Sequence, residues 1–408
     1  MSDSRALSAP RIEELIMNSR QYLQIPGPTN IPERILRSLS QPLINHRGPE
    51  FEQLLAENTQ GLKKVFRTAN DVLMFPSSGS GMLESAVVNL FSPGDTVLVG
   101  SVGVFSERMA VIAESHQLNV IRIKKEWGQA VKADDVREVL EQDREKKIKA
   151  VCLPHNETTS GITHDIEGIA RMIKKIGHPA VTVVDAISSL ACVPLETDLW
   201  GIDIVVSASQ KGFMLPPGLG FVSVSPKAWE LRERSTLPKW YWDYKAVKEK
   251  NKAHQFPYTP PTTLFFGLKE SLDILLNEEG IENVWRRHAV IGAAVRNAAL
   301  AMGLSLFAEK GYESDTVTAL TLPEGIAYKA LAEVLRDRYH VIIGGGLQKL
   351  QGKIFRIGHI GALHIPEVLA IMGAVEMALV QSGYKARLGS AAQAAAETYL
   401  RMTSAAAG

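Results

Sequence analysis

The chain has very little cysteine. Its 408 residues include only Cys152 and Cys192, which are too few for a disulfide framework or a thiolate zinc site. Both lie beside apolar runs, as small core residues usually do. We therefore expect two buried, chemically inert thiols and no metal site.

Long apolar runs and an excess of charge are missing as well. The most apolar stretches, such as 180–194, are interrupted by charge and are too short to span a bilayer. The first twenty residues lack the apolar segment of a secretory signal, and the last five, SAAAG, are not a peroxisomal signal. The 45 Lys and Arg residues against 44 Asp and Glu leave a net charge of +1, which indicates neither nucleic acid nor a membrane as a partner. The expectation is a cytoplasmic protein.

Seven short apolar runs alternate with helical patterns between about residues 70 and 225. They lie at 72–75, 96–100, 119–123, 149–154, 181–185, 203–207 and 220–225. Strands that are apolar on both faces belong to a covered sheet. This region therefore predicts an α/β domain with a mostly parallel seven-stranded sheet, and the carboxyl ends of its strands should carry the chemistry.

The rest of the chain has a different rhythm. Residues 226–262 are rich in aromatics and proline and predict an irregular excursion. A smaller α+β domain follows, with strands at 316–322, 340–346 and 354–358, helices at 264–279, 281–302 and 327–338, a final helix at 365–381, and an alanine-rich tail at 391–407. We expect an N-terminal arm and active-site segment at 1–45, a large cofactor-binding domain at 46–280 and a small domain at 281–408.

A turn of small residues, SSGSGMLE at 77–84, follows the first strand of the large domain and opens a helix. Unpaired backbone N–H groups and the positive end of the helix dipole suit a phosphate there, and serine hydroxyls add donors. A plain serine N-cap is the structural alternative. A dinucleotide fingerprint needs a third glycine, and Glu84 stands in its place.

Two further residues come directly after apolar strands. Asp185 ends the run VTVVD, where a carboxylate needs a partner, either a helix N-terminus or a cation such as a pyridinium nitrogen. Lys211 has no charged neighbour between Asp203 and Lys227. Such a lysine has its pKa pushed down, which suits Schiff-base chemistry, although many lysines simply face solvent. A phosphate turn, a carboxylate and a lysine on one sheet edge together indicate pyridoxal 5′-phosphate.

Motifs along nearly the whole chain, from about residue 26 to 400, resemble those of class V aminotransferases of fold type I. They are similar to the serine–glyoxylate and alanine–glyoxylate group in particular. The motifs are PGPTNIP at 26–32, HRGPEF at 46–51, HNETTSGI at 155–162, SQKGFMLPPGLGF at 209–221, YTPP at 258–261 and GKIFRIGHIG at 352–361.

The resemblance assigns roles to most of the candidate residues. It implies that Lys211 carries the cofactor and moves the proton during catalysis, and that Asp185 pairs with the pyridine nitrogen, which makes the ring a better electron sink. The remaining implied cofactor contacts are a phosphate cup of Ser78, Gly79, Ser80 and Gln210, and a hydroxyl near the phenolic oxygen from Thr159.

Other implied contacts have structural alternatives. Phe105 falls where an aromatic ring stacks on the cofactor in this family, but it also suits a helix core. Tyr258 and Thr259 match residues that reach the phosphate of the neighbouring subunit, which implies a homodimer with shared sites; a tetramer stays open. Arg356 interrupts an apolar strand and matches the clamp on the substrate carboxylate, with a structural ion pair as the alternative. Asn45 lies near the substrate entrance of the family.

The resemblance implies an aminotransferase with a ping-pong cycle that aminates glyoxylate to glycine. L-serine, giving hydroxypyruvate, is the leading amino donor. Alanine, aspartate and ureidoglycine compete with it, because the phosphate turn and the loop SVGVFSER at 101–108 depart from relatives of the group. A class V lyase, a nicotinamide-dependent oxidoreductase and a non-catalytic binding protein are the alternatives of other kinds. The partners of such an aminotransferase would be small amino acids and 2-oxo acids.

Overall fold

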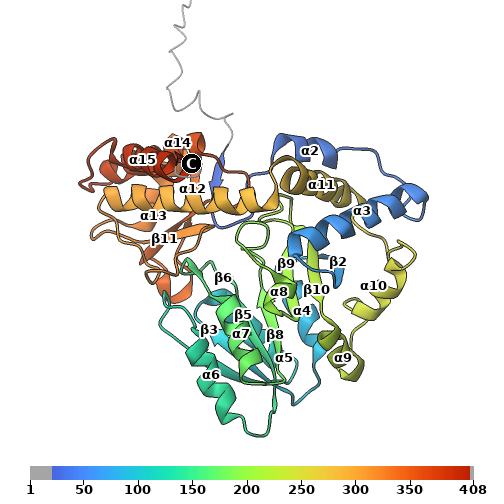
Figure 1. Cartoon of the computed structure of the whole chain (residues 1–408). Helices are drawn as coiled ribbons and strands as arrows, with labels where there is room; N and C mark the ends of the chain where they lie inside the picture. The colour runs from blue at the N-terminus through green and yellow to red at the C-terminus, as the bar shows by residue number, and fades with distance from the viewer. Residues whose placement is uncertain (1–20, 405–408) are drawn as a thin grey trace, which may run out of the picture.

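The computed structural model describes residues 21–404. Its centre is a seven-stranded sheet in the order β2-β10-β9-β8-β5-β3-β4, in which only β10 runs antiparallel to its neighbours (Figure 1). The strands are β2 (Asp71–Ser77), β3 (Thr96–Ser101), β4 (Asn119–Lys124), β5 (Ile148–Pro154), β8 (Val181–Asp185), β9 (Ile204–Ala208) and β10 (Gly218–Val224). The predicted mostly parallel sheet of seven strands is therefore confirmed.

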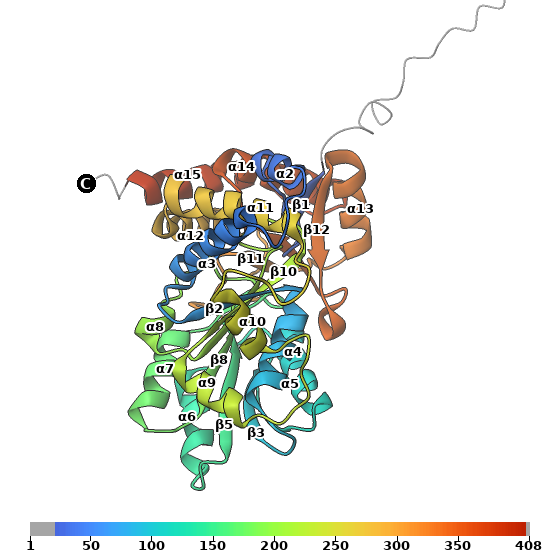
Figure 2. The same ribbon diagram turned by 90° about the vertical axis from the view of Figure 1, so that its right-hand side faces the viewer.

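Helices cover both faces of this sheet, because successive strand residues point to opposite sides. Val183 and Val205, for example, belong to two separate hydrophobic cores, one on each face. Figure 2 shows α4 and α5 on one side and α6 and α7 on the other. The helices around the sheet are α3 (Pro49–Phe66), α4 (Gly79–Leu90), α5 (Val104–Ser115), α6 (Ala133–Gln142), α7 (Ile166–Lys175), α8 (Thr197–Trp200), α9 (Pro226–Arg234) and α10 (Tyr244–Asn251).

A second, four-stranded sheet has the order β1-β12-β13-β11. Its strands are β1 (Tyr22–Gln24), β11 (Val317–Thr321), β12 (Val341–Gly345) and β13 (Ile354–Gly358). The helices of this part are α12 (Ile281–Ala301), α13 (Tyr328–Tyr339), α14 (Ile365–Gln381) and α15 (Ser390–Ser404). Strand β1 lies far from β12 in sequence but pairs with it, so the N-terminal segment joins the sheet of the C-terminal part (Figure 2).

The remaining elements connect these two parts. They are α2 (Glu33–Leu39), α11 (Thr262–Asp273), a π-helical turn (Ile274–Glu278), a short 3₁₀ turn (Gln348–Leu350) and a small hairpin of β6 (Asn156–Glu157) and β7 (Ile162–Thr163). The hairpin lies at the carboxyl end of β5, where the site residues gather. The exact boundaries of the expected arm and domains stay a prediction.

Two expectations about the chain's organisation are wrong. The helix at 365–381 is not the last one, because the alanine-rich stretch, as far as residue 404, forms α15 and packs on α12 and α14. Alanine has the highest helix propensity, and Ala391 and Ala395 are buried there. The stretch 226–262 also contains two helices, α9 and α10.

Both thiols are buried and unpaired as expected, and burial raises the pKa of Cys152 and Cys192 to about 12. Within residues 21–404, no helix is both long enough and apolar enough to cross a bilayer.

Candidate active site

The small-residue turn lies between β2 and α4. Ser78 is the N-cap of α4, and its hydroxyl oxygen accepts a hydrogen bond from the Gly81 N–H at 3.4 Å. A Cβ on Gly79 would lie 2.6 Å from Ile187 Cδ1, and one on Gly81 would lie 2.9 Å from Trp242 Cη2. The backbone therefore passes too close to its neighbours for larger residues, and the first N–H groups of α4 stay at the mouth of the site.

Several predicted site residues meet at one cavity of about 200 Å³. The sequence analysis identified Ser78, Gly79, Ser80, Phe105, Asp185, Gln210 and Lys211 among its lining residues. It missed the contributions of Gly27, Leu83, Arg108, Asn156, Thr158, Ile187 and Ser188. The carboxyl ends of β2, β3, β8 and β9 bring the first group together, as expected for a parallel sheet.

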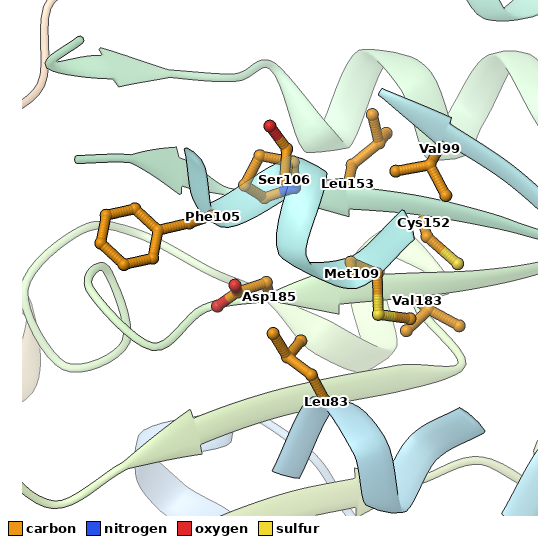
Figure 3. Close-up of a pocket in the computed structure, with 10 residues that line it drawn as sticks. Leu83, Val99, Phe105, Ser106, Met109, Cys152, Leu153, Val183 and Asp185 are labelled. Carbon is orange, nitrogen blue, oxygen red and sulfur yellow. The ribbon is translucent and has the colours of Figure 1, made fainter. Parts of the chain in front are cut away.

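Asp185 ends β8 above an apolar layer. Figure 3 shows its carboxylate between Phe105 and Leu83, with Met109 and Val183 nearby around a narrow cavity of about 10 Å³. The carboxylate accepts one hydrogen bond, from the Ile187 N–H at 2.9 Å. Burial raises the pKa of Asp185 to about 7. The carboxylate is therefore poised to meet a protonated nitrogen.

Lys211 follows β9, and its ammonium donates a hydrogen bond to the carbonyl oxygen of Pro26. Burial lowers the pKa of Lys211 to about 8, and the charge of Arg356 acts in the same direction, while Asp185 opposes it. Such a pKa brings the neutral amine within reach near physiological pH, which nucleophilic attack on a carbonyl requires.

Arg108 was missed because it depends on a contact between two helices. Its guanidinium donates to Ser80 Oγ at 2.8 Å and lies 5.0 Å from the ring centroid of Phe105. It thus adds a positive charge to the turn at the start of α4, where an anion would bind.

Glu157 was missed as well, although it lies inside the motif HNETTSGI. Its buried carboxylate accepts hydrogen bonds from the Ser106 N–H at 2.9 Å and the Thr159 N–H at 3.0 Å. Thr159 Oγ1 in turn accepts from the Val104 N–H at 3.0 Å. The start of α5, which carries Phe105, and the β6–β7 hairpin are therefore one hydrogen-bonded unit. The signal available in the sequence was the carboxylate of Glu157 within the motif HNETTSGI, whose residues are buried in the fold.

Arg356 lies in the middle of β13 and is only 6% exposed. Its Nε donates to the Gly345 carbonyl at 2.9 Å and its Nη1 to the Thr158 carbonyl at 3.0 Å. Burial lowers the pKa of the guanidinium. Its hydrogen-bond partners among residues 21–404 are these two carbonyls, and the charge of Glu157 only opposes the effect of burial on its pKa, so no direct ion pair explains this arginine.

Five predicted residues lie outside the lining of this cavity: Thr159 and Arg356, described above, and Tyr258, Thr259 and Asn45. Tyr258 stacks on Tyr241 with 4.5 Å between the ring centroids and donates to the Tyr241 carbonyl at 3.0 Å. Thr259 follows it in the chain, and Asn45 Oδ1 accepts from the Arg47 N–H at 3.0 Å. Their predicted roles toward cofactor and substrate stay predictions.

The residues of the cavity fit pyridoxal 5′-phosphate in kind and in order. The start of α4, two serine hydroxyls and Arg108 suit a phosphate, and Asp185 suits a ring nitrogen. Lys211 offers an amine to an aldehyde. Gln210 also has a buried side-chain oxygen without a partner among the described residues. This oxygen can accept a hydrogen bond from a ligand in the cavity.

Residues 21–357 match the family model described as Aminotransferase class-V. A serine–glyoxylate aminotransferase from Methylorubrum extorquens is 40% identical over 389 residues, covering 94% of this chain and 96% of the relative. An L-aspartate–glyoxylate aminotransferase from Paracoccus denitrificans is 40% identical over 392 residues, covering 96% and 99%. A protein named as the small subunit of a soluble hydrogenase from Synechococcus is 40% identical over 384 residues, covering 94% and 99%.

Solved structures agree with the fold. The ureidoglycine–glyoxylate aminotransferase of Bacillus subtilis is 25% identical and superimposes with a TM-score of 0.87, covering 93% of this chain and 98% of that chain. Relatives of equal identity bear different names, so overall identity alone does not select the substrate.

Proposed function

Because this chain belongs to the class V aminotransferases and is a pyridoxal-phosphate-dependent transaminase, we propose that it moves the amino group of L-serine to glyoxylate. The products are hydroxypyruvate and glycine, formed in a ping-pong cycle. The single observation that carries the mechanism is the meeting of Lys211, Asp185 and the turn at 78–80 at one cavity. The relatives named for glyoxylate support the acceptor.

When bound, the cofactor supplies an aldehyde for amines and a ring that takes up the electrons left at the substrate α-carbon. The turn at 78–80 and Arg108 hold its phosphate, and Gln210 adds a side-chain contact. Asp185 Oδ keeps the proton on the ring nitrogen through charge and hydrogen bonding. Phe105, beside the Ser106 N–H that Glu157 binds, would cover one face of the ring, and Thr159 would supply a hydroxyl for its phenolic oxygen.

Lys211 performs the proton transfer. With the cofactor bound, its Nζ would take the proton from the substrate α-carbon and later give one back, which requires an uncharged amine. The lowered pKa of Lys211, about 8, keeps that form accessible. Arg356 binds the substrate carboxylate, and the carbonyls of Gly345 and Thr158 hold its guanidinium in place.

The polarity of the cavity favours serine over aspartate as the donor. Its lining contains two cations, Lys211 and Arg108, and both already have roles toward the cofactor. A second substrate carboxylate would therefore lack a cation of its own. Among the polar lining residues, Thr158 offers a hydroxyl that suits the hydroxyl of serine, whereas Asn156 and Ser188 already bond each other at 2.8 Å.

We also propose a homodimer with shared sites, in which Tyr258 and Thr259 reach the phosphate of the partner and Asn45 lines the substrate entrance. Trp240, which stacks beside Tyr258, is 82% exposed. A large aromatic surface next to the site is typical of a protein interface.

The absorption spectrum of the purified protein with pyridoxal phosphate tests this function. The band of the lysine-bound cofactor should fall when L-serine is added and return when glyoxylate follows. A response only to alanine or aspartate would show that the donor is wrong. The absence of any band after the cofactor is added would overturn the roles of Lys211 and Asp185.

A further inference from the structure

The segment 25–27, which we call the N-terminal strap, connects the two parts of the molecule at the site. Strand β1 pairs in parallel with β12, so that Gln24 lies beside Ile343 in the small sheet. The next three residues leave this sheet and cross to the end of β9. Farther along, the Thr29 N–H donates to the Gln210 carbonyl at 3.3 Å, and the Thr29 hydroxyl donates to the Lys211 carbonyl at 3.4 Å. The strap is thus anchored on both sides.

The strap touches the reactive end of Lys211 directly. The lysine ammonium donates to the Pro26 carbonyl, and Gly27 lines the cavity. A Cβ on Gly27 would lie 2.6 Å from Lys211 Cδ and 2.7 Å from Cε, and closer still to Nζ. Gly27 also has φ +117°, a conformation that L side chains rarely adopt. A side chain at this position would therefore take the space that the lysine occupies.

The other side of the strap rests on the strands that hold Arg356. A Cβ on Gly358 would lie 2.9 Å from Pro26 N and closer to the Ile25 carbonyl. A Cβ on Gly344 would lie 3.1 Å from Pro26 Cδ. Gly344 is the register partner of Arg356 in the β12–β13 pair. Close backbone packing on this side thus ties the strap to the proposed substrate-binding arginine.

We propose that the N-terminal strap positions the amine of Lys211 whenever that amine is not bonded to the cofactor, with Pro26 as its hydrogen-bond acceptor and Gly27 as the residue that leaves it room. A free amine in this cavity needs a partner, since an unpaired buried polar group is costly. The strap residues are positioning residues, because they act through Lys211. This inference rests on the proposed function, which gives Lys211 both a bonded and a free form.

The substitution Gly27→Ala tests the proposal, with Gly94→Ala as its matched control. Gly94 also has positive φ (+85°), but a Cβ there meets nothing within 4 Å. The control therefore also places an alanine at positive φ, but without the contact to the lysine. Both variants are incubated with pyridoxal phosphate, the visible band is recorded, and borohydride reduction followed by mass measurement of the Lys211 peptide gives the fraction of cofactor attached.

We expect Gly27→Ala to slow the attachment of the cofactor by about tenfold or more, because the unbonded amine must leave the position in which the strap holds it. Its kcat should fall more than its KM rises, while Gly94→Ala retains the wild-type values. Equal attachment and equal kcat in the two variants would overturn the role of the strap. If the wild-type protein itself attaches no cofactor, the proposed function fails instead.

A milder variant keeps the test decisive if Gly27→Ala does not fold. Gly344→Ala pushes on Pro26 from the far side and does not contact Lys211 in this structure. We expect a smaller fall in the rate of cofactor attachment, together with a shift in the pH at which Lys211 of the cofactor-free protein reacts with acetic anhydride. An unchanged pH profile and unchanged attachment in Gly344→Ala would contradict the proposal.

Discussion

The two sheets contribute to the site in different ways. The large sheet presents its reactive groups just beyond the ends of strands, as with Asp185 after β8 and Lys211 after β9. The small sheet presents Arg356 from the middle of β13, where two carbonyls hold it. A group at a strand end can serve chemistry without supporting the sheet. We therefore expect substitutions on the large sheet to affect mainly function, and substitution of Arg356 to affect function and stability together.

The largest effect should come from Lys211→Ala. It removes the amine that we propose bonds the cofactor and moves the proton, so kcat with the proposed substrates serine and glyoxylate should fall about 10⁴-fold or more. Because Lys211 lies beyond the strand end, the thermal midpoint of the cofactor-free protein should not fall. Lys227→Ala is the matched control. Lys227 Nζ also donates to a carbonyl, that of Ala180 at 2.8 Å, but this contact lies at the amino end of β8, away from the site. Retained turnover in Lys211→Ala would contradict the mechanism.

Asp185→Asn should come next, with about a 10³-fold loss of kcat, because a neutral amide does not hold a proton on the ring nitrogen. Its effect on stability should have the opposite sign. The ordinary carboxyl pKa is 3.8, and burial raises it to about 7 in the folded protein. The folded state therefore binds the proton more tightly, and ionisation destabilises it progressively as the pH rises from about 4 through 7.

The asparagine variant has no such ionisation and can still accept the Ile187 N–H. Its advantage in stability over the wild-type protein, both free of cofactor, should grow by about 2 kcal/mol between pH 5 and pH 8, allowing for the solvent that reaches the side chain. Thermal unfolding at the two pH values measures this difference. An advantage that shrinks with rising pH would show that Asp185 does not have a raised pKa.

Arg356→Lys tests the small sheet. A lysine has one ammonium, which cannot donate to the carbonyls of Gly345 and Thr158 and also bind both oxygens of a carboxylate. We expect KM for serine to rise about 100-fold and the thermal midpoint to fall by several degrees. In Arg296→Lys, which alters an arginine bonded to the Ser314 carbonyl and to Asp315, stability should fall without a change in KM. Equal KM values for the two variants would remove Arg356 from the substrate site.

The same contrast explains what the sequence could predict. The seven large-sheet strands appear near their predicted bounds, because buried parallel strands have continuous apolar runs. Asp185 and Lys211 stood out because each follows such a run. Glu157, Arg108 and Gly27 were missed because their importance depends on contacts with residues far away in sequence: Glu157 with Ser106, Arg108 with Ser80, and Gly27 with Lys211. Local pattern cannot supply such pairings.

The smallest effect should come from Ser80→Ala at the start of α4. The turn has several donors, namely the helix N–H groups, the Ser78 hydroxyl and the Arg108 guanidinium, so loss of one hydroxyl should weaken binding of pyridoxal phosphate only about three- to tenfold. Because Ser80 Oγ accepts from Arg108 at 2.8 Å, the variant also frees that guanidinium to follow the phosphate, which limits the loss. Fluorescence titration of the cofactor-free protein measures the dissociation constant, with the exposed Ser115→Ala at the far end of α5 as control. A loss above a hundredfold would mean that Arg108 depends on Ser80 for its orientation. Arg108 would then resemble Arg356, whose guanidinium depends on two carbonyls for its position.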